Sequence, residues 1–225
     1  MLVERSMHPE WLSNSYLVAD EPGGRAVIID SGAPAEPLLD AIERHEVTPE
    51  QLLLTHHQLE AERLLDVDTA FEPGEVLEVG GLRIDAIHTP GHTAGMLAFR
   101  VNDSEVFTGD TLFKGSVGGV RAPGSTTFED LRSSVMDVLM KLPPQTVVRP
   151  GHTDPTTIGE EWEGNAFVRL WRGLDEESHE RCRVGEEEAV LVLFAPDYDG
   201  GHKAWVRWTA SGRDDIVPGS AVERY

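Results

Sequence analysis

The sequence predicts an α/β protein with a small antiparallel β appendage at its C-terminal end, and three observations lead to this fold class. Apolar runs of strand length alternate with helical periods over the first two thirds of the chain. The last part shows apolar strands and Gly-containing turns but no helical period. A length of 225 residues fits one large domain with an appendage. We place the division between residues 1–184 and residues 185–225.

Strands are predicted wherever a short apolar run is bounded by turn residues. In the main domain they cover residues 16–19, 26–30, 51–54, 82–87, 96–101, 105–108 and 146–148. In the appendage they cover residues 190–194 and 204–208, followed by two shorter segments. Both appendage strands carry apolar residues on each face, so the appendage should pack against the main domain or a second subunit.

Helices are predicted where apolar residues recur with a period of 3.6. Residues 34–46 form the first amphipathic period. Two further helices begin at capping-box signatures, Thr126 with Glu129 and Thr157 with Glu160. The second of these continues through Trp171.

The charge balance bears on partners and location. Forty Asp and Glu against nineteen Lys and Arg give a net charge of -21, which repels nucleic-acid phosphates and anionic lipids. No apolar run approaches the ~18 residues of a membrane span, and no signal peptide is evident. The single Cys182 cannot form an internal disulfide. We therefore expect a cytoplasmic protein with a small-molecule substrate, no nucleic-acid or membrane partner, and a homo-oligomer as an open possibility.

Four predicted strands end at a metal-binding type of side chain: His56, His92, Asp110 and His152. Each one alone could be a loop cap, and Asp110 could close an Asx turn. Loops at one sheet edge, however, collect polar groups from distant strands into one cleft. Histidine nitrogens with a carboxylate oxygen form a ligand set for zinc or iron. The four residues together therefore predict a metal site.

Six short motifs resemble the metallo-β-lactamase-fold superfamily, in its glyoxalase II-like (hydroxyacylglutathione hydrolase-like) branch. They are N-S-Y-L at 14–17, I-D-S-G at 29–32, L-L-T-H at 53–56, H-T-P-G-H-T at 88–93, T-G-D-T-L-F at 108–113 and P-G-H at 150–152 with T-T-I-G at 156–159. The resemblance spans roughly residues 14–170. It implies an αββα sandwich with a metal pair at one edge.

The resemblance also implies roles for the four residues. His56 and His92 match ligands of the first metal, Asp110 matches the bridging carboxylate, and His152 matches a ligand of the second metal. One or two zinc ions, or alternatively iron, would lower the pKa of bound water to about 7. The implied function is hydrolysis of a thioester or related acyl substrate by metal-bound hydroxide, which the catalytic Asp110 would orient.

The chain departs from the family at one place. The family motif T-H-x-H-x-D-H is interrupted here, because Thr55 and His56 are followed by H-Q-L-E-A at 57–61. His57 and Gln58 are possible substitute ligands or solvent-facing loop residues, and Glu60 and Glu62 fit an exposed helix face. Either a ligand-bearing segment has been lost and the site is degenerate, or a loop is missing from the sequence between His57 and Leu59.

Three further expectations follow. Glyoxalase II enzymes bind glutathione through basic residues of a helical C-terminal region, whereas this region is acidic and forms strands, so a different thiol or acyl carrier is expected. The first metal position keeps three ligands and the second only His152 and Asp110, so with this sequence the second should be empty or weakly filled and the first partly filled at best. Two alternatives to the hydrolase stay open: a mononuclear iron persulfide dioxygenase and a non-catalytic binding or assembly module.

Overall fold

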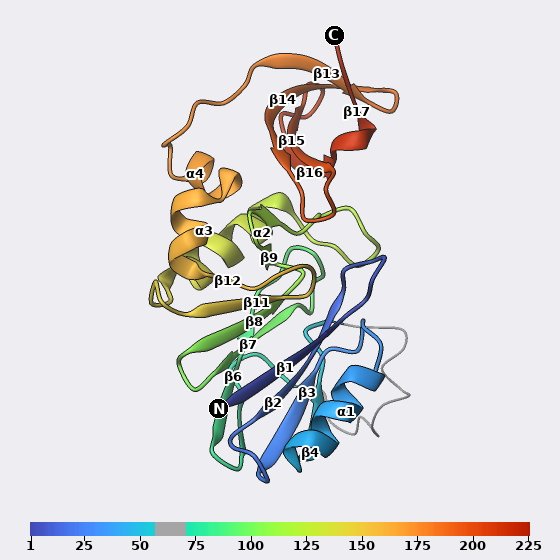
Figure 1. Cartoon of the computed structure of the whole chain (residues 1–225). Helices are drawn as coiled ribbons and strands as arrows, with labels where there is room; N and C mark the ends of the chain where they lie inside the picture. Colours follow the sequence, from blue (N-terminus) through green and yellow to red (C-terminus); the bar gives the residue numbers. More distant parts are fainter. Residues whose placement is uncertain (57–70) are drawn as a thin grey trace.

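The computed structural model describes residues 1–56 and 71–225, and its larger part contains two facing sheets (Figure 1). The first sheet has the strand order β1-β2-β3-β4: β1 (Leu2–Met7), β2 (Asn14–Ala19), β3 (Arg25–Ile29) and β4 (Thr48–Leu53). β3 and β4 are parallel and are connected by helix α1 (Glu36–His45). The sequence pattern misses β1, because its apolar residues stand at the two ends around three polar residues, with no alternation, and most of its side chains are only half-buried.

The second sheet has six strands in the order β12-β11-β8-β7-β6-β5. They are β5 (Val76–Val79), β6 (Leu82–His88), β7 (Leu97–Val101), β8 (Glu105–Gly109), β11 (Val147–Pro150) and β12 (Thr156–Thr157). The hairpin of β9 (Leu112–Phe113) and β10 (Ser116–Val117) follows β8. β8 and β11 are parallel, and the other neighbours in this sheet are antiparallel.

Strand β2 shows how the two sheets become two inner layers. All six of its residues are buried. Tyr16 and Val18 face the second sheet, where they join a core with Phe99 and Phe107. Leu17 and Ala19 point the other way and pack against α1. Because successive side chains of a strand alternate between faces, an uninterrupted apolar run is what a strand between two layers requires.

The helices of the second outer layer begin at capping threonines. α2 (Phe128–Ser133) begins one residue later than the capping box predicts: the Thr127 hydroxyl, not that of Thr126, accepts the hydrogen bond from Asp130 N at 3.1 Å. The helix continues as a π-helical turn (Ser134–Val138) and a 3₁₀ turn (Leu139–Lys141). At the other predicted start, Thr157 caps the next helix by accepting from Glu160 N, so that prediction is confirmed.

The predicted single helix through Trp171 is wrong, because the chain forms two helices, α3 (Ile158–Gly164) and α4 (Ala166–Trp171). Asn165 lies between them with an extended backbone, and its side-chain oxygen accepts hydrogen bonds from Phe167 N and Val168 N. An Asn side chain that bonds to nearby backbone competes with helix continuation and favours a cap.

The layers follow the order helix, sheet, sheet, helix (Figure 1). α1 covers the first sheet, and α2, α3 and α4 pack on the second through a core that includes Leu131, Ile158 and Phe167. The αββα sandwich implied by the resemblance is thus confirmed. Among the described residues, no helix is long and apolar enough to cross a membrane.

The C-terminal part is a five-stranded antiparallel sheet that lies beyond α2 and α4 in Figure 1. Its order is β16-β15-β14-β13-β17: β13 (Glu180–Val184), β14 (Glu187–Pro196), β15 (His202–Trp208), β16 (Asp214–Pro218) and β17 (Val222–Arg224). Trp205 and Ile216 join the core formed by the helices of the sandwich, so the sheet packs on the main domain. The sheet also includes β13, which precedes residue 185, and the division of the chain into two domains at that point stays a prediction.

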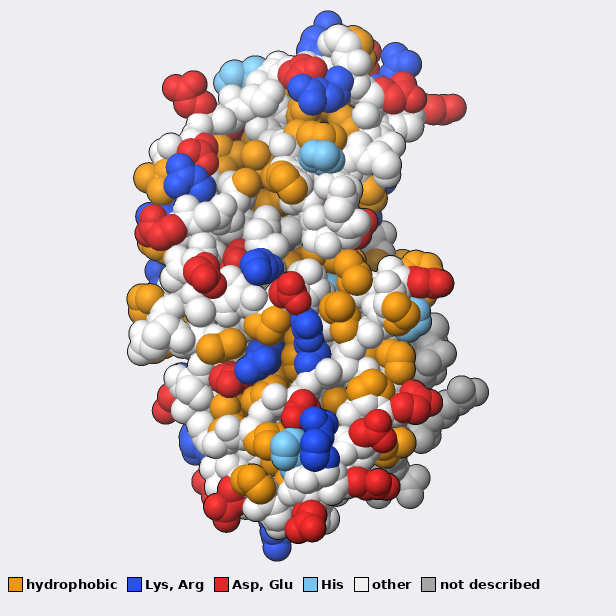
Figure 2. Space-filling view, viewed as in Figure 1, with side chains coloured by type: hydrophobic (Ala, Val, Ile, Leu, Met, Phe, Trp, Pro, Cys, Tyr) orange, Lys and Arg blue, Asp and Glu red, His pale blue; other side chains and the backbone are white. Residues whose placement is uncertain are grey.

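Charged side chains are distributed widely on the face shown in Figure 2. Asp and Glu side chains are spread over the whole of this face, and Lys and Arg side chains lie among them. The net charge of -21 is therefore not gathered into one acidic patch on this face.

Candidate metal centre

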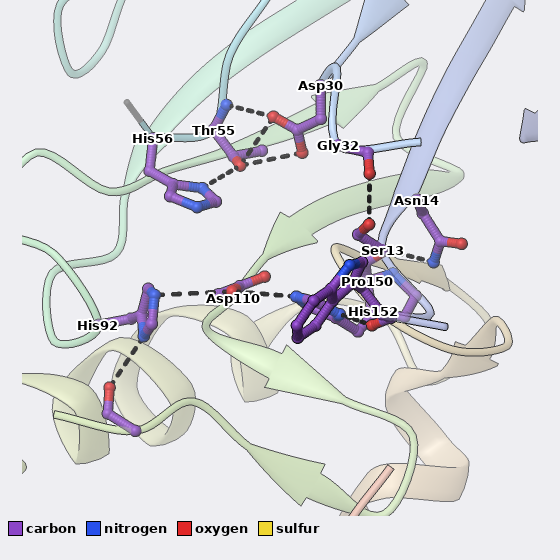
Figure 3. A network of polar contacts seen from close by, with 12 residues as sticks. Ser13, Asn14, Asp30, Gly32, Thr55, His56, His92, Asp110, Pro150 and His152 are labelled. Carbon is purple, nitrogen blue, oxygen red and sulfur yellow. Dashed lines mark hydrogen bonds and ion pairs between the residues drawn. The ribbon is translucent and has the colours of Figure 1, made fainter. Parts of the chain in front are cut away.

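The sheet topology places three of the four predicted ligands at one edge. β6, β8 and β11 run in the same direction, because β7 is antiparallel to both β6 and β8, and β8 is parallel to β11. His92 follows β6, Asp110 follows β8 directly, and His152 follows β11. His56 follows β4 of the facing sheet and completes the group (Figure 3).

Asp110 lies between the histidines. Its Oδ2 is 3.6 Å from His92 Nε2 and 3.4 Å from His152 Nε2. Metal-ligating atoms of His56, His92 and Asp110 all lie within 4.8 Å of one another. The rings of His56 and His92 are perpendicular, with their centroids 5.7 Å apart. The structure thus brings together all four predicted residues, three as one group and His152 on the opposite side of the shared carboxylate.

The Nδ1 atoms of the three histidines are held by other parts of the chain. Gly119 O lies 2.9 Å from Nδ1 of His92, and Trp11 O lies 2.9 Å from Nδ1 of His152. A carbonyl accepts only from a protonated Nδ1, so each of these rings presents Nε2 as the ligand atom toward Asp110. Thr55 Oγ1 lies 2.9 Å from Nδ1 of His56 (Figure 3).

Buried Asp30 holds the segment that carries His56 through hydrogen bonds from Thr55. Its carboxylate accepts hydrogen bonds from Thr55 N at 2.9 Å and from Thr55 Oγ1 at 3.0 Å. Burial raises the pKa of Asp30 to about 7, and the bonds from Thr55 act against this rise. Asp30 therefore supports the site indirectly, through Thr55.

The pKa values of the central pair favour an ion pair. Burial raises the pKa of Asp110, but the hydrogen bond and charge of His152, with the charges of His56 and His92, more than offset this and hold it well below the usual range. Burial lowers the pKa of His152, yet Asp110 brings it above the ordinary value. Asp110 is thus an ionised carboxylate, which is the form that binds a metal.

Gly151 permits the close approach of Asp110 to the β11 edge. A Cβ atom at this position would overlap Asp110 Oδ1 and would lie 2.9 Å from the Gly109 carbonyl carbon. Any other residue between Pro150 and His152 would therefore displace the carboxylate. This gives a physical reason for glycine in the P-G-H motif.

The other histidines in the described part of the chain do not join the group. Those at 8, 45, 88 and 202 make local contacts instead: with backbone N–H groups of Glu10 and Trp11, with Glu4, with Ala94 O, and with the Phe194 ring, respectively. His57, Gln58, Glu60 and Glu62 lie outside the described residues. The glycine-rich segment 114–119 forms a rim of the site, since Gly119 O holds His92.

The donor set fits a transition metal. Two imidazole nitrogens and an ionised carboxylate oxygen within 4.8 Å of one another are compatible with a single ion at ligand distances of about 2.0–2.2 Å. On the other side of Asp110, His152 is the one additional ligand among the described residues in contact with that carboxylate. Among the described residues, the geometry could supply three protein ligands to one ion and two to a second.

The sequence interpretation does not predict that the C-terminal sheet forms one wall of the site. The turn between β14 and β15 brings Tyr198 onto the ring of His152, with centroids 4.7 Å apart and an interplanar angle of 27°. The same Tyr198 ring lies 4.7 Å from that of Phe113. The C-terminal sheet supplies no ligand among the described residues, but it forms part of the site. No local motif marks this role, because D-Y-D-G-G at 197–201 is typical of an ordinary turn.

Comparison with known proteins shows the family of this chain. Residues 57–152 match the family model of the metallo-beta-lactamase superfamily. Hydroxyacylglutathione hydrolase GloC of Haemophilus influenzae is 32% identical, over 69% of this chain and 92% of GloC. The chain belongs to the metallo-beta-lactamase superfamily.

Two further proteins are similar to this chain. BaeB of Bacillus velezensis, a probable polyketide biosynthesis zinc-dependent hydrolase, is 26% identical over 78% of this chain and 88% of BaeB. The crystal structure of TTHA1623 in a di-iron-bound form is 30% identical, with a TM-score of 0.59, over 72% of this chain and 98% of that chain.

The match with GloC also shows a length difference inside the superfamily domain. The alignment runs over 198 positions, whereas 69% of 225 residues is about 155, so about 40 positions have no counterpart in this chain. The interrupted motif at residues 55–61 is one place where the chain departs from the family pattern.

Proposed function

We propose that this member of the superfamily is a metal-dependent hydrolase of a thioester or related small acyl substrate. The observation that carries the proposal is the ionised Asp110, whose Oδ2 lies 3.6 and 3.4 Å from two Nε2 atoms already oriented by backbone carbonyls. Such a prearranged set of nitrogen and oxygen donors is suited to a catalytic metal rather than to packing.

His56, His92 and Asp110 would hold the first ion, and Asp110 with His152 would supply two ligands of a second ion, which needs further ligands to be held firmly. A zinc or iron ion there supplies a Lewis acid for a carbonyl oxygen and lowers the pKa of water in the site. The residues of the chain contribute by positioning the attacking water. The Asp110 carboxylate accepts a hydrogen bond from the attacking water and fixes its direction, so this residue is the proposed catalytic group.

The proposed reaction consumes one water. The water oxygen forms a bond to the acyl carbon, the carbon–sulfur bond breaks, and the proton released by the water ends on the thiolate sulfur. Similarity to GloC, a hydroxyacylglutathione hydrolase, supports an acyl-thiol substrate. Zinc is supported by the donor set and by similarity to a zinc-dependent hydrolase, and iron by similarity to a protein crystallised with two iron ions.

The test is turnover of a thioester panel by protein reconstituted with zinc or with iron(II). We expect metal-dependent release of thiol, detected with a thiol reagent, from at least one S-acyl compound. Inactivity on every thioester with turnover of a β-lactam or a phosphoester would contradict the thioester assignment. Oxygen consumption on a persulfide by iron-loaded protein would support the dioxygenase alternative.

Metal content gives a second, independent measurement. Elemental analysis of freshly purified protein should find at least one equivalent of zinc or iron per chain. Two equivalents would show that further ligands exist beyond His56, His92, Asp110 and His152. No metal, and none gained on adding zinc or iron, would contradict the hydrolase and favour a non-catalytic binding module.

A further inference from the structure

The C-terminal sheet is fastened to the metal edge by one buried group of polar side chains. Lys203, at the start of β15, is 7% exposed. Its Nζ lies 3.2 Å from Asp197 Oδ1 and donates to Val117 O at 2.6 Å. Asp197 also accepts from Ser116 Oγ at 2.7 Å. These bonds tie the 197–201 turn to the β9–β10 hairpin, and so place Tyr198 against His152.

A cavity of about 450 Å³ lies between this turn and the His92 side of the metal centre. One wall is formed by His92 and the loop at 119–122. The opposite wall is formed by the C-terminal sheet, through residues of the 197–203 segment and of β16. A cavity of this volume is in the range of small-molecule sites. It opens beside a metal ligand, so a substrate whose carbonyl is at the metal centre has its substituent in the cavity.

The two Lys and Arg side chains that line the cavity each lie beside a carboxylate. Lys203 is paired with Asp197, and Arg121 Nη1 lies 3.7 Å from Asp215 Oδ2. Asp199, on the turn, is exposed and adds a negative charge at the cavity. A carboxylate-bearing group such as glutathione would therefore compete there with carboxylates that already neighbour both cations, and would lie near the charge of Asp199.

The rest of the lining is largely apolar. Ala122, Val217 and Pro218 contribute aliphatic surface, and the rings of Tyr198 and His202 contribute aromatic surface. Both rings are held by stacking, Tyr198 on His152 and His202 on Phe194, the latter with centroids 4.7 Å apart. Preformed aromatic walls of this kind bind apolar groups without first being ordered.

We propose that this cavity binds an uncharged, largely apolar substituent of the substrate, and that the C-terminal sheet thereby determines specificity at the metal centre. The inference rests on the proposed function for the chemistry of the carbonyl, but it concerns binding and can be measured without turnover. An apolar group could belong to the acyl side or to the thiol side of a thioester, and the experiment separates these two sources.

The experiment measures binding to metal-free full-length protein by titration calorimetry. The probes are neutral N-acetylcysteamine thioesters with acetyl and octanoyl groups, an S-acetyl alkanethiol that is lengthened on the thiol side, and S-octanoylglutathione. We expect the octanoyl probe or the lengthened alkanethiol probe to bind at least about 10-fold more tightly than the acetyl probe, since burial of two methylene groups corresponds to about that factor. S-octanoylglutathione should bind more weakly than the neutral octanoyl probe.

Two matched variants locate the binding. Ala122→Trp places a large side chain into the cavity from an exposed loop. In this variant the longer probes should bind no more tightly than the acetyl probe, so the gain from lengthening is lost. Ala210→Trp makes the same change in the exposed β15–β16 turn, outside the cavity lining, and should retain the gain.

The outcomes separate this inference from the hydrolase. Equal binding of short and long probes, or loss of the gain in both variants, would overturn the cavity assignment even if the protein hydrolyses thioesters. A length-dependent gain lost only in Ala122→Trp would support it even if no probe is turned over.

Discussion

Two regions meet at the metal centre, and they are held there in different ways. The sandwich loops hold each ligand separately: Gly119 O contacts His92, Trp11 O contacts His152, and Thr55 contacts His56. The C-terminal turn is held mainly by one buried ion pair between Lys203 and Asp197 and its hydrogen bonds to the β9–β10 hairpin. Ligand positions are thus supported independently, whereas the polar contacts that hold the 197–201 turn form a single group.

This difference suggests a division of labour. Changes in the sandwich loops should affect metal binding and turnover, and changes in the C-terminal turn should affect substrate selection and the docking of the sheet. Distant side chains that share no partner have nearly additive effects, so the two kinds of effect can be measured separately. The four predictions below test this division, from the largest expected effect to the smallest.

Asp110→Ala should give the largest loss, because this carboxylate is shared by both ligand groups. Loss of an outer partner of a ligand typically costs 10–100-fold, so loss of a ligand common to two groups should lower kcat/KM by at least about 1,000-fold. Metal content should fall in parallel, measured by elemental analysis. Asp40→Ala, on the exposed face of α1, is the control and should keep the parent's kcat/KM and metal content. Full metal content in Asp110→Ala would contradict the assignment of this residue.

Local sequence patterns predict the sandwich well where one interaction dominates. The buried strand β2 and the capped start of α3 follow from an apolar run and a Thr-x-x-Glu spacing. The break at Asn165 does not, because its side chain can cap a helix only once Phe167 N and Val168 N are placed near it. In the same way β1 is determined by its pairing with β2 rather than by its own mixed sequence.

The residues of the candidate site show the same contrast between local sequence patterns and long-range contacts. His92, Asp110 and His152 are found from sequence because each follows a strand within a short motif, and the sheet direction alone brings them to one edge. Tyr198 and Lys203 are not found, because their contacts with His152 and Val117 join segments far apart in the chain. Such contacts depend on how the C-terminal sheet docks, which no local pattern encodes.

Lys203→Met tests the support of the C-terminal wall. Removing one partner of a buried pair leaves Asp197 without its counter-charge and typically costs about 3–5 kcal/mol. Both side chains are about 10% exposed or less, so we expect the free energy of unfolding to fall by about 3 kcal/mol, measured by urea denaturation. Lys141→Met, at an exposed site, should change it by less than about 0.5 kcal/mol.

A second variant distinguishes charge from packing at this pair. Asp197→Asn combined with Lys203→Met removes both charges and should recover part of the lost stability. Metal affinity of either variant, where folded, should stay close to that of the parent, because neither residue contacts a ligand histidine or Asp110. Equal loss of metal affinity and of stability would contradict the division between the two regions.

Gly151→Ala acts on the sandwich side without changing a ligand. The added Cβ would overlap Asp110 Oδ1 and crowd the Gly109 backbone, so Asp110 must shift away from the line between His92 and His152. We expect a 10–100-fold loss of metal affinity, as for other disturbed ligand orientations. The matched control is Gly164→Ala at the exposed end of α3, where a Cβ meets nothing within 4 Å. Metal affinity equal to that of Gly164→Ala would show that the close approach of Gly151 to Asp110 is not required.

Tyr198→Ala should have the smallest effect and is the most direct test of the boundary between the two regions, because Tyr198 belongs to the C-terminal turn but stacks on the ligand His152. Each aromatic pair contributes about 0.5–1.5 kcal/mol beyond burial, and Tyr198 makes two, with His152 and Phe113. Since Trp11 O still holds Nδ1 of His152, the first metal equivalent should be retained, whereas the affinity for a lengthened neutral thioester should fall about 5–10-fold. Tyr198→Phe keeps both ring contacts and should recover most of that affinity. If Tyr198→Ala instead lost its metal and kept its preference for the longer thioester, Tyr198 would belong functionally to the metal centre, and the separation of the two regions would be wrong at this residue.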